Sequence, residues 1–224
     1  MMEYNWCDMD SFDEYLRPTY LCDFNGDPEI KITAHRLTQC IEDKREAFNH
    51  IYHFVRELPY VLENWDVKAS DTLRKGRGMC SAKSNLLVAM CRALMIPCRY
   101  QIFKIEAERT LWNWILQQNS ELANEMCEPL SEHDHVIVGV YLDKWEMYDP
   151  SRDTAFEKGL KRLGIRLERK PVIVSSDGPS MIVLASIDEW AANRQKARRF
   201  KRSRELIFSR VNEQFDQIRL SALG

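Results

Sequence analysis

Three side chains whose chemistry is complementary occur in the order Cys80, His135, Asp149. A thiol nucleophile needs a base to take its proton, and the base needs a third group that orients it. Groups that act together in this way are recognised by role and geometry rather than by position in the sequence. The order therefore indicates thiol catalysis, provided that the fold brings the three residues together.

Cys80 opens a run that is predicted to be a buried helix. Gly76 and Gly78 precede it and suit a tight turn into the helix, because glycine tolerates backbone angles that other residues avoid. In the first helical turn, unpaired N–H groups and the helix dipole favour a thiolate and can hold a developing oxyanion. The alternative is a structural cysteine, because free cysteines are usually small core residues. This segment by itself leaves both interpretations open.

His135 stands at the start of a predicted strand, and Asp149 ends the next one. If the hairpin loop has an odd number of residues, the register pairs Val140 with Lys144 and places His135 directly opposite Asp149. Directly paired side chains lie about 4.5–5.5 Å apart at Cβ, which suits an imidazole held by a carboxylate. A slip of one residue would break the arrangement. His133 lies on the same strand face as His135 and is the reserve candidate for the base. The hairpin could equally have a structural role alone.

The remaining histidines give no strong signal of chemistry. His35, His50 and His53 fall in the two predicted N-terminal helices and are interpreted as structural or surface residues. His133 and His135 share a strand face, but no third ligand stands at metal-site spacing. We therefore expect no metal site.

The composition describes an ordinary globular protein. The 224 residues are 45% hydrophobic and 29% charged, with a net charge of −2, so the whole chain has no electrostatic reason to bind nucleic acid or an anionic membrane. The acidic N-terminus predicts no secretory signal, and no window approaches the length of an apolar membrane span. The cysteines are odd in number, irregularly spaced and without a CxxC motif, which predicts reduced thiols in the cytoplasm.

The predicted order of elements, which is helices first, then a helix and several strands, then a terminal helix, is typical of an α+β fold with an antiparallel sheet. Helices come first, the cysteine helix ends at Pro97, and further strands and helices follow. Besides the cysteine helix, helices are predicted within segments 25–37, 40–60, 108–126 and 187–219, and strands at 98–105, 135–142, 144–149, 171–176 and 180–186.

The C-terminal part changes character. Segment 193–210 is dense in Arg and Lys and holds one acid. We divide the chain into a catalytic domain at 1–185 and a basic amphipathic helix at 186–224, packed on the domain or on a partner. The alternative is nucleic-acid binding, because a basic helix face can follow phosphates. The apolar stripe predicted for this helix is Ala197, Phe200, Leu206, Ile207 and Val211.

Three separated segments resemble the transglutaminase-like superfamily of papain-type thiol enzymes. They are "GRGMCSAKSNLLVAMCRALMIPCRY", "HVIVGVYLDKWEMYDPS" and the upstream helix "IYHFVRELPY". The resemblance spans roughly residues 41–152. It implies a papain-like core and makes Cys80 the nucleophile, His135 the base and Asp149 the orienting group. It also implies acyl transfer with no metal and no organic cofactor.

The sequence departs from the family pattern at a few positions. Met95 replaces the usual glycine before Ile-Pro, Val136-Ile137 replaces Ala-Trp, and Ser151 replaces threonine after Asp-Pro. The chain is too short for the calcium sites and extra β domains of the large animal enzymes, so it resembles a compact microbial member.

The resemblance leads to an expected reaction and to a competing function. We expect attack on a peptide bond or a glutamine side-chain amide through a thioester, with a protein or peptide as substrate. The region of Tyr60 and Trp65 is where a second oxyanion donor could arise. The competing function is an inactive scaffold that binds a protein partner.

Overall fold

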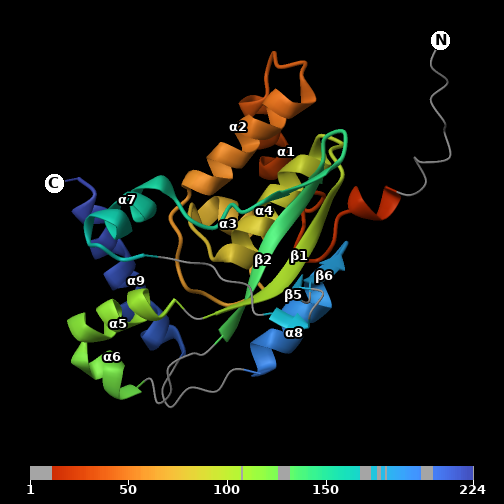
Figure 1. Ribbon diagram of the computed structural model, residues 1–224. Helices are drawn as coiled ribbons and strands as arrows, with labels where there is room; N and C mark the ends of the chain where they lie inside the picture. The colour runs from red at the N-terminus through yellow and green to blue at the C-terminus, as the bar shows by residue number, and fades with distance from the viewer. Residues whose placement is uncertain are drawn as a thin grey trace, which may run out of the picture.

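The computed structural model describes residues 12–106, 108–125, 132–166, 173–175, 178–179, 181–197 and 204–223. As predicted, the fold combines helices with an antiparallel sheet (Figure 1). Before the sheet come η2 (Asp13–Tyr15), α1 (Pro28–Leu37), α2 (Lys44–Glu57), α3 (Ala69–Lys75) and α4 (Cys80–Ala93). They are followed by β1 (Cys98–Glu106), α5 (Arg109–Gln118), α6 (Ser120–Glu125), β2 (Glu132–Tyr141), β3 (Trp145–Tyr148), α7 (Thr154–Arg162), β4 (Ile173–Ser175), β5 (Gly178–Pro179), β6 (Met181–Leu184), α8 (Asp188–Ala197) and α9 (Arg204–Ser221).

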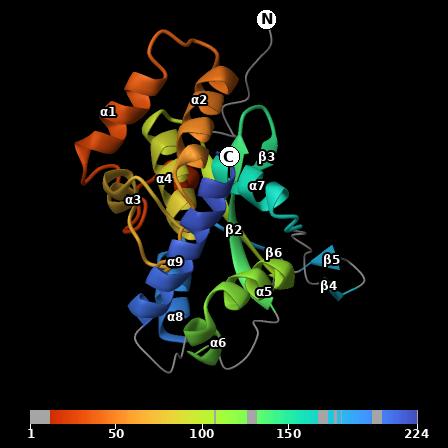
Figure 2. The ribbon, with the colours of Figure 1, turned by 90° about the vertical axis from the view of Figure 1, so that its left-hand side faces the viewer.

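Helix α4 is the centre of the domain. Every residue from Cys80 to Arg92 is buried. Figure 2 shows α4 between α1 and α3 on one side and β2 on the other, and these elements contact it. A helix enclosed on all sides is a rigid mount for a side chain at its tip.

The main sheet has the strand order β3-β2-β1-β6 and is antiparallel. Alternate residues of β2, namely Val136, Val138 and Val140, join the core together with α4, as the two-residue period of a strand requires. In the described part of the chain, the two predicted strands near the C-terminus belong to different sheets. The first contains β4, which pairs with β5, whereas β6 extends the main sheet beside β1.

The hairpin of β2 and β3 has a different register from the predicted one. Val140 pairs with Glu146 and not with Lys144, because the loop begins one residue later, at Leu142. Strand β2 continues through Tyr141, whose N–H donates to the carbonyl of Pro97 at 3.0 Å. The ring of Tyr141 also packs edge-on against Trp145 across the hairpin, with centroids 5.5 Å apart.

Several helices differ from the predictions in extent. The predicted helix at 108–126 divides into α5 and α6 at Asn119, whose backbone is extended and whose side chain caps α6 by accepting the N–H of Leu122. The predicted spine of Leu111, Ile115 and Leu122 is buried. Helices α3 and α7 were not predicted, although Asp153 is a recognisable N-cap whose carboxylate accepts the N–H of Phe156.

The C-terminal segment forms two helices in different places rather than one long helix (Figure 1). Helix α8 lies by the main sheet and α9 packs on α7. Residues 198–203, including Phe200 of the predicted stripe, lie outside the described residues. The buried stripe of α9 contains Ile207 and Val211 as predicted, but Leu206 is 39% exposed. Instead, the stripe continues through Phe215 and Ile218.

No helix among the described residues has both the length and the apolar character that a membrane span requires.

Candidate active site

Cys80 is the first residue of α4, as the sequence predicts. Gly76 ends α3 with a left-handed φ of 63°, which redirects the chain toward α4. Gly78 is needed for close approach, because a Cβ there would lie 3.1 Å from both Thr72 Cγ2 and Ala82 Cβ. The N–H of Gly78 donates to the carbonyl of Pro59 at 3.1 Å. The two glycines therefore bring the loop after α2 against the tip of α4.

The loop after α2 lines the first turn of α4. Glu63 accepts the N–H of Met79 at 3.0 Å, and its burial raises the pKa of this carboxyl group. Ser81 Oγ donates to the carbonyl of Trp65 at 3.4 Å, and the Trp65 ring packs edge-on against Trp190 of α8. Of the two aromatic residues predicted near the oxyanion, Trp65 thus lies beside the turn that carries Cys80.

Tyr60, the other predicted aromatic residue, forms a backbone bridge with Gly78, two residues before Cys80, and its side chain packs against both core clusters. Its ring packs against Phe156 and Phe215 of α7 and α9, at centroid distances of 6.2 and 5.6 Å. Its N–H donates to Asp153 at 2.9 Å. Tyr60 therefore helps to hold the C-terminal helix on the domain.

The tip of α4 lies against the start of β2. Ser84, one turn after Cys80, donates through Oγ to the carbonyl of Val136 at 3.3 Å. Residues four apart share a helix face, and Val136 directly follows His135. This bond therefore joins the helix face of the thiol to the strand segment of the imidazole. Cys80 is 4% exposed and His135 3% exposed, so both are shielded from water.

His135 and Asp149 are hydrogen-bonded. His135 Nε2 lies 2.9 Å from Asp149 Oδ2. The two residues are not directly opposite, because the observed register, extended beyond β3, would place Ser151 across from His135. Asp149 follows the last residue of β3, and its carboxylate reaches the imidazole from outside the ladder. The ring of Phe103, paired with His135 across β1 and β2, packs edge-on against the imidazole.

The carboxylate of Asp149 is itself fixed in place. Its Oδ1 accepts the N–H of Ser151 at 3.0 Å and the hydroxyl of Ser151 at 2.6 Å. The hydroxyl of Tyr52 donates to the backbone carbonyl of Asp149 at 3.0 Å. Because an ionised carboxylate only accepts hydrogen bonds, Nε2 of His135 carries the shared proton. Nδ1 is then the ring nitrogen that can exchange a proton with another group.

The other histidines occupy positions that agree with the sequence interpretation. His35, His50 and His53 are exposed on α1 and α2. His133, the reserve candidate, pairs with Ile105 further down β2, and it is His135 that receives Asp149. Among the residues that the structure describes, no group of three or more His, Cys, Asp or Glu side chains could hold a metal ion.

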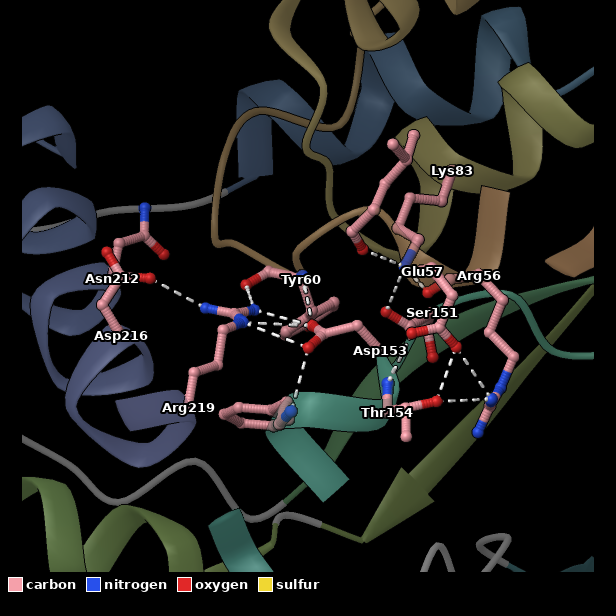
Figure 3. A network of polar contacts seen from close by, with 12 residues as sticks. Arg56, Glu57, Tyr60, Lys83, Ser151, Asp153, Thr154, Asn212, Asp216 and Arg219 are labelled. Atoms are coloured by element: carbon pink, nitrogen blue, oxygen red, sulfur yellow. Dashed lines mark hydrogen bonds and ion pairs between the residues drawn. The ribbon is translucent and has the colours of Figure 1, made fainter. Parts of the chain in front are cut away.

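Two residues of this region were missed as contributors to the site. Ser151 was noted only as a departure from the family pattern, yet it supplies two hydrogen bonds to Asp149. Lys83, which lies in the cysteine helix, was not predicted to contribute to the site. It is fully buried and donates to the carbonyl of Ser151 at 3.0 Å (Figure 3). A lysine within a run of small and apolar residues could have indicated this role, because lysine is rarely buried without a partner.

The fold and the site define a class of protein, in which a cysteine at a helix tip lies against a sheet that carries a His–Asp pair. A family model described as the transglutaminase-like superfamily matches residues 31–150, more than half of the chain. The chain belongs to the transglutaminase-like superfamily.

Two solved structures resemble the chain. One is a candidate cysteine protease from Cytophaga hutchinsonii, with 16% identity, a TM-score of 0.44 and 80% of this chain covered. The other is a candidate protease from Parabacteroides distasonis, with 16% identity, a TM-score of 0.39 and 63% of this chain covered. The chain spans 52% of the first protein and 26% of the second. No curated protein matches the sequence.

Proposed function

We propose that this protein is a thiol acyl-transfer enzyme that acts on amide bonds of a protein or peptide through Cys80, His135 and Asp149. The observation that carries the proposal is the 2.9 Å hydrogen bond between His135 and Asp149 on the strand segment against which the cysteine helix packs. Membership of the transglutaminase-like superfamily supports the same chemistry.

In the proposed reaction, Nδ1 of His135 takes the proton of the Cys80 thiol, and the thiolate attacks the carbonyl carbon of an amide. The oxyanion is held at the N-terminal turn of α4, where backbone N–H groups and the positive end of the helix dipole stabilise negative charge. The imidazolium then protonates the departing amine as the C–N bond breaks, which leaves a thioester on Cys80. Water or a second amine takes the acyl group and restores the thiol.

The test is the pH dependence of alkylation of each cysteine by iodoacetamide, followed by mass spectrometry. Cys80 is only 4% exposed, so the pH midpoint of the reaction is more diagnostic than its absolute rate. Cys40 is exposed and is the internal reference for a solvent-accessible thiol. Cys22 is the buried reference, because burial raises its pKa to about 12.

We expect Cys80 to be alkylated with a midpoint well below that of Cys40, and we expect His135→Ala to move the midpoint of Cys80 up toward that of Cys40. Cys80→Ala and His135→Ala should both abolish turnover of amide substrates while leaving the circular dichroism spectrum unchanged. If the midpoint of Cys80 equals that of Cys40, or if either variant keeps full activity, the proposed triad is wrong. The inactive-scaffold alternative would then be the one to pursue.

A further inference from the structure

Lys83 is a charged side chain in the interior of the domain. It lies on α4, three residues after Cys80, and is fully buried. Its Nζ donates to the carbonyls of Arg56 at 2.9 Å, Leu58 at 2.6 Å and Ser151 at 3.0 Å (Figure 3). An ammonium group has three donors, and all three are used here.

The first two carbonyls explain why a cation is tolerated at this position. Arg56 and Leu58 lie at the C-terminal end of α2, where the last carbonyl groups have no partner within the helix. The negative end of a helix dipole also stabilises a cation. Lys83 therefore caps α2, and its third hydrogen bond extends from this cap to Ser151.

The third hydrogen bond leads to the proposed triad. Ser151 is fully buried, and its N–H and hydroxyl both donate to Oδ1 of Asp149. The other oxygen of Asp149 contacts His135. Lys83 thus fixes the carbonyl of the residue whose two donors fix the carboxylate.

The charged side chains near Lys83 act on its protonation in opposite directions. Asp153 and Glu57 favour its charged form, whereas Arg219 and Arg56 oppose it. Burial is the largest influence and lowers the pKa of Lys83 to about 7. A buried cation generally gives less stability than a well-packed apolar side chain of similar size, so packing alone does not account for a lysine here.

We propose that Lys83 and Ser151 are positioning residues of the triad: Lys83 holds Ser151, and Ser151 aims the carboxylate of Asp149 at His135. The inference rests on the proposed function for its catalytic meaning. The hydrogen-bond chain itself can be tested without a substrate.

The test compares Lys83→Met with Arg92→Met as a matched control. Arg92 is a second buried cation of α4 and donates to three backbone carbonyls, those of Arg17, Cys98 and Ala185. Arg92 lies in the last turn of α4, so the control loses a buried cation at the far end of the same helix. The first readout is the titration of the His135 imidazole, followed by ¹⁵N NMR.

We expect Lys83→Met and Ser151→Ala to lower the midpoint of the His135 titration, because a misplaced carboxylate no longer stabilises the imidazolium. Ser151→Thr keeps the hydroxyl and should behave as wild type. Arg92→Met should lower the melting temperature without moving the midpoint. The alkylation rate of Cys80 at pH 6 should fall about tenfold in Lys83→Met and Ser151→Ala, because displacements of the order of 1 Å at a reacting group have effects of at least this size.

The outcomes separate the positioning role from the proposed function. If Ser151→Ala and Lys83→Met leave the His135 midpoint unchanged, the positioning role is overturned. If Lys83→Met does not fold, Ser151→Ala still decides the question, since it leaves the lysine in place. If the His135 midpoint moves as expected but wild-type Cys80 titrates like Cys40, the positioning chain stands and the proposed function fails.

Discussion

The pair of Arg219 and Asp153 should decide whether the C-terminal helix stays on the domain. Arg219 Nη2 donates to Asp153 at 2.8 Å and to the carbonyl of Tyr60 at 2.5 Å (Figure 3). The side chains of Arg219 and Asp153 are only 12% and 4% exposed. The arginine thus joins α9 to the start of α7 and to the loop after α2, so Arg219→Met should weaken the docking of α9.

The expected cost follows from the carboxylate that the substitution leaves behind. Removing one partner of a buried ion pair costs about 3–5 kcal/mol, because the other charge stays buried without compensation. Asp153 would keep hydrogen bonds from the N–H groups of Tyr60 and Phe156. We therefore expect Arg219→Met to cost about 3 kcal/mol, at the low end of that range.

Urea denaturation at pH 7, followed by circular dichroism at 222 nm, measures this cost. The control is Arg17→Met, which removes an ion pair with Asp13 whose side chains are 69% and 63% exposed. An exposed pair of this kind contributes about 0–1 kcal/mol. The double variant Asp153→Asn/Arg219→Met carries no stranded charge, so it should be less destabilised than the sum of the single variants.

A result in which Arg219→Met costs no more than Arg17→Met would refute this reasoning. It would mean that the apolar stripe of α9 holds the helix in place without the buried ion pair. Strict additivity in the double variant would equally show that the two side chains do not act together.

Three further predictions concern stability. Burial would raise the pKa of Asp153, but hydrogen bonds from Arg219 and from backbone N–H groups lower this pKa overall. The stabilising effect of the Asp153 carboxylate should therefore be lost as the pH falls below about 4. Urea midpoints measured between pH 2 and 7 should show this loss, and Asp153→Asn should give a flatter profile. A Cβ at Gly159 would overlap the carbonyl oxygen of Ile218, so Gly159→Ala should cost about 1–3 kcal/mol in urea, whereas Gly26→Ala, with its nearest atom at 3.6 Å, should be tolerated. Met95 has a left-handed φ of 59°, so Met95→Gly should raise the melting temperature in calorimetry; an unchanged or lower value would contradict the strain.

Much of the candidate site could be predicted from local sequence signals. The helix of Cys80 is bounded by Gly78 and Pro97, and both mark a helix end through their own backbone preferences. The alternation of β2 placed His135 and its strand correctly. The proximity of His135 and Asp149 was also anticipated, because a tight hairpin leaves few possible registers.

The register itself could not be predicted from the hairpin sequence. The register depends on where β2 ends. This is decided by the hydrogen bond from the N–H of Tyr141 to the carbonyl of Pro97 and by the contact between the rings of Tyr141 and Trp145. The first of these partners lies far from Tyr141 in the sequence. The predicted register was therefore wrong by two residues, although the parity that places His135 and Asp149 on one side was preserved.

The sequence by itself determined the α+β class of the fold, the helix tip that carries Cys80 and the residue types of the candidate triad. These features follow from caps, turn residues and side-chain periodicity, which act within a few neighbouring residues. Only the tertiary structure decided that Lys83 reaches Ser151, that α8 and α9 separate, and that Arg219 meets Asp153. Each of these depends on which distant backbone carbonyl or carboxylate lies within reach, because a buried charge is stable only where such partners converge.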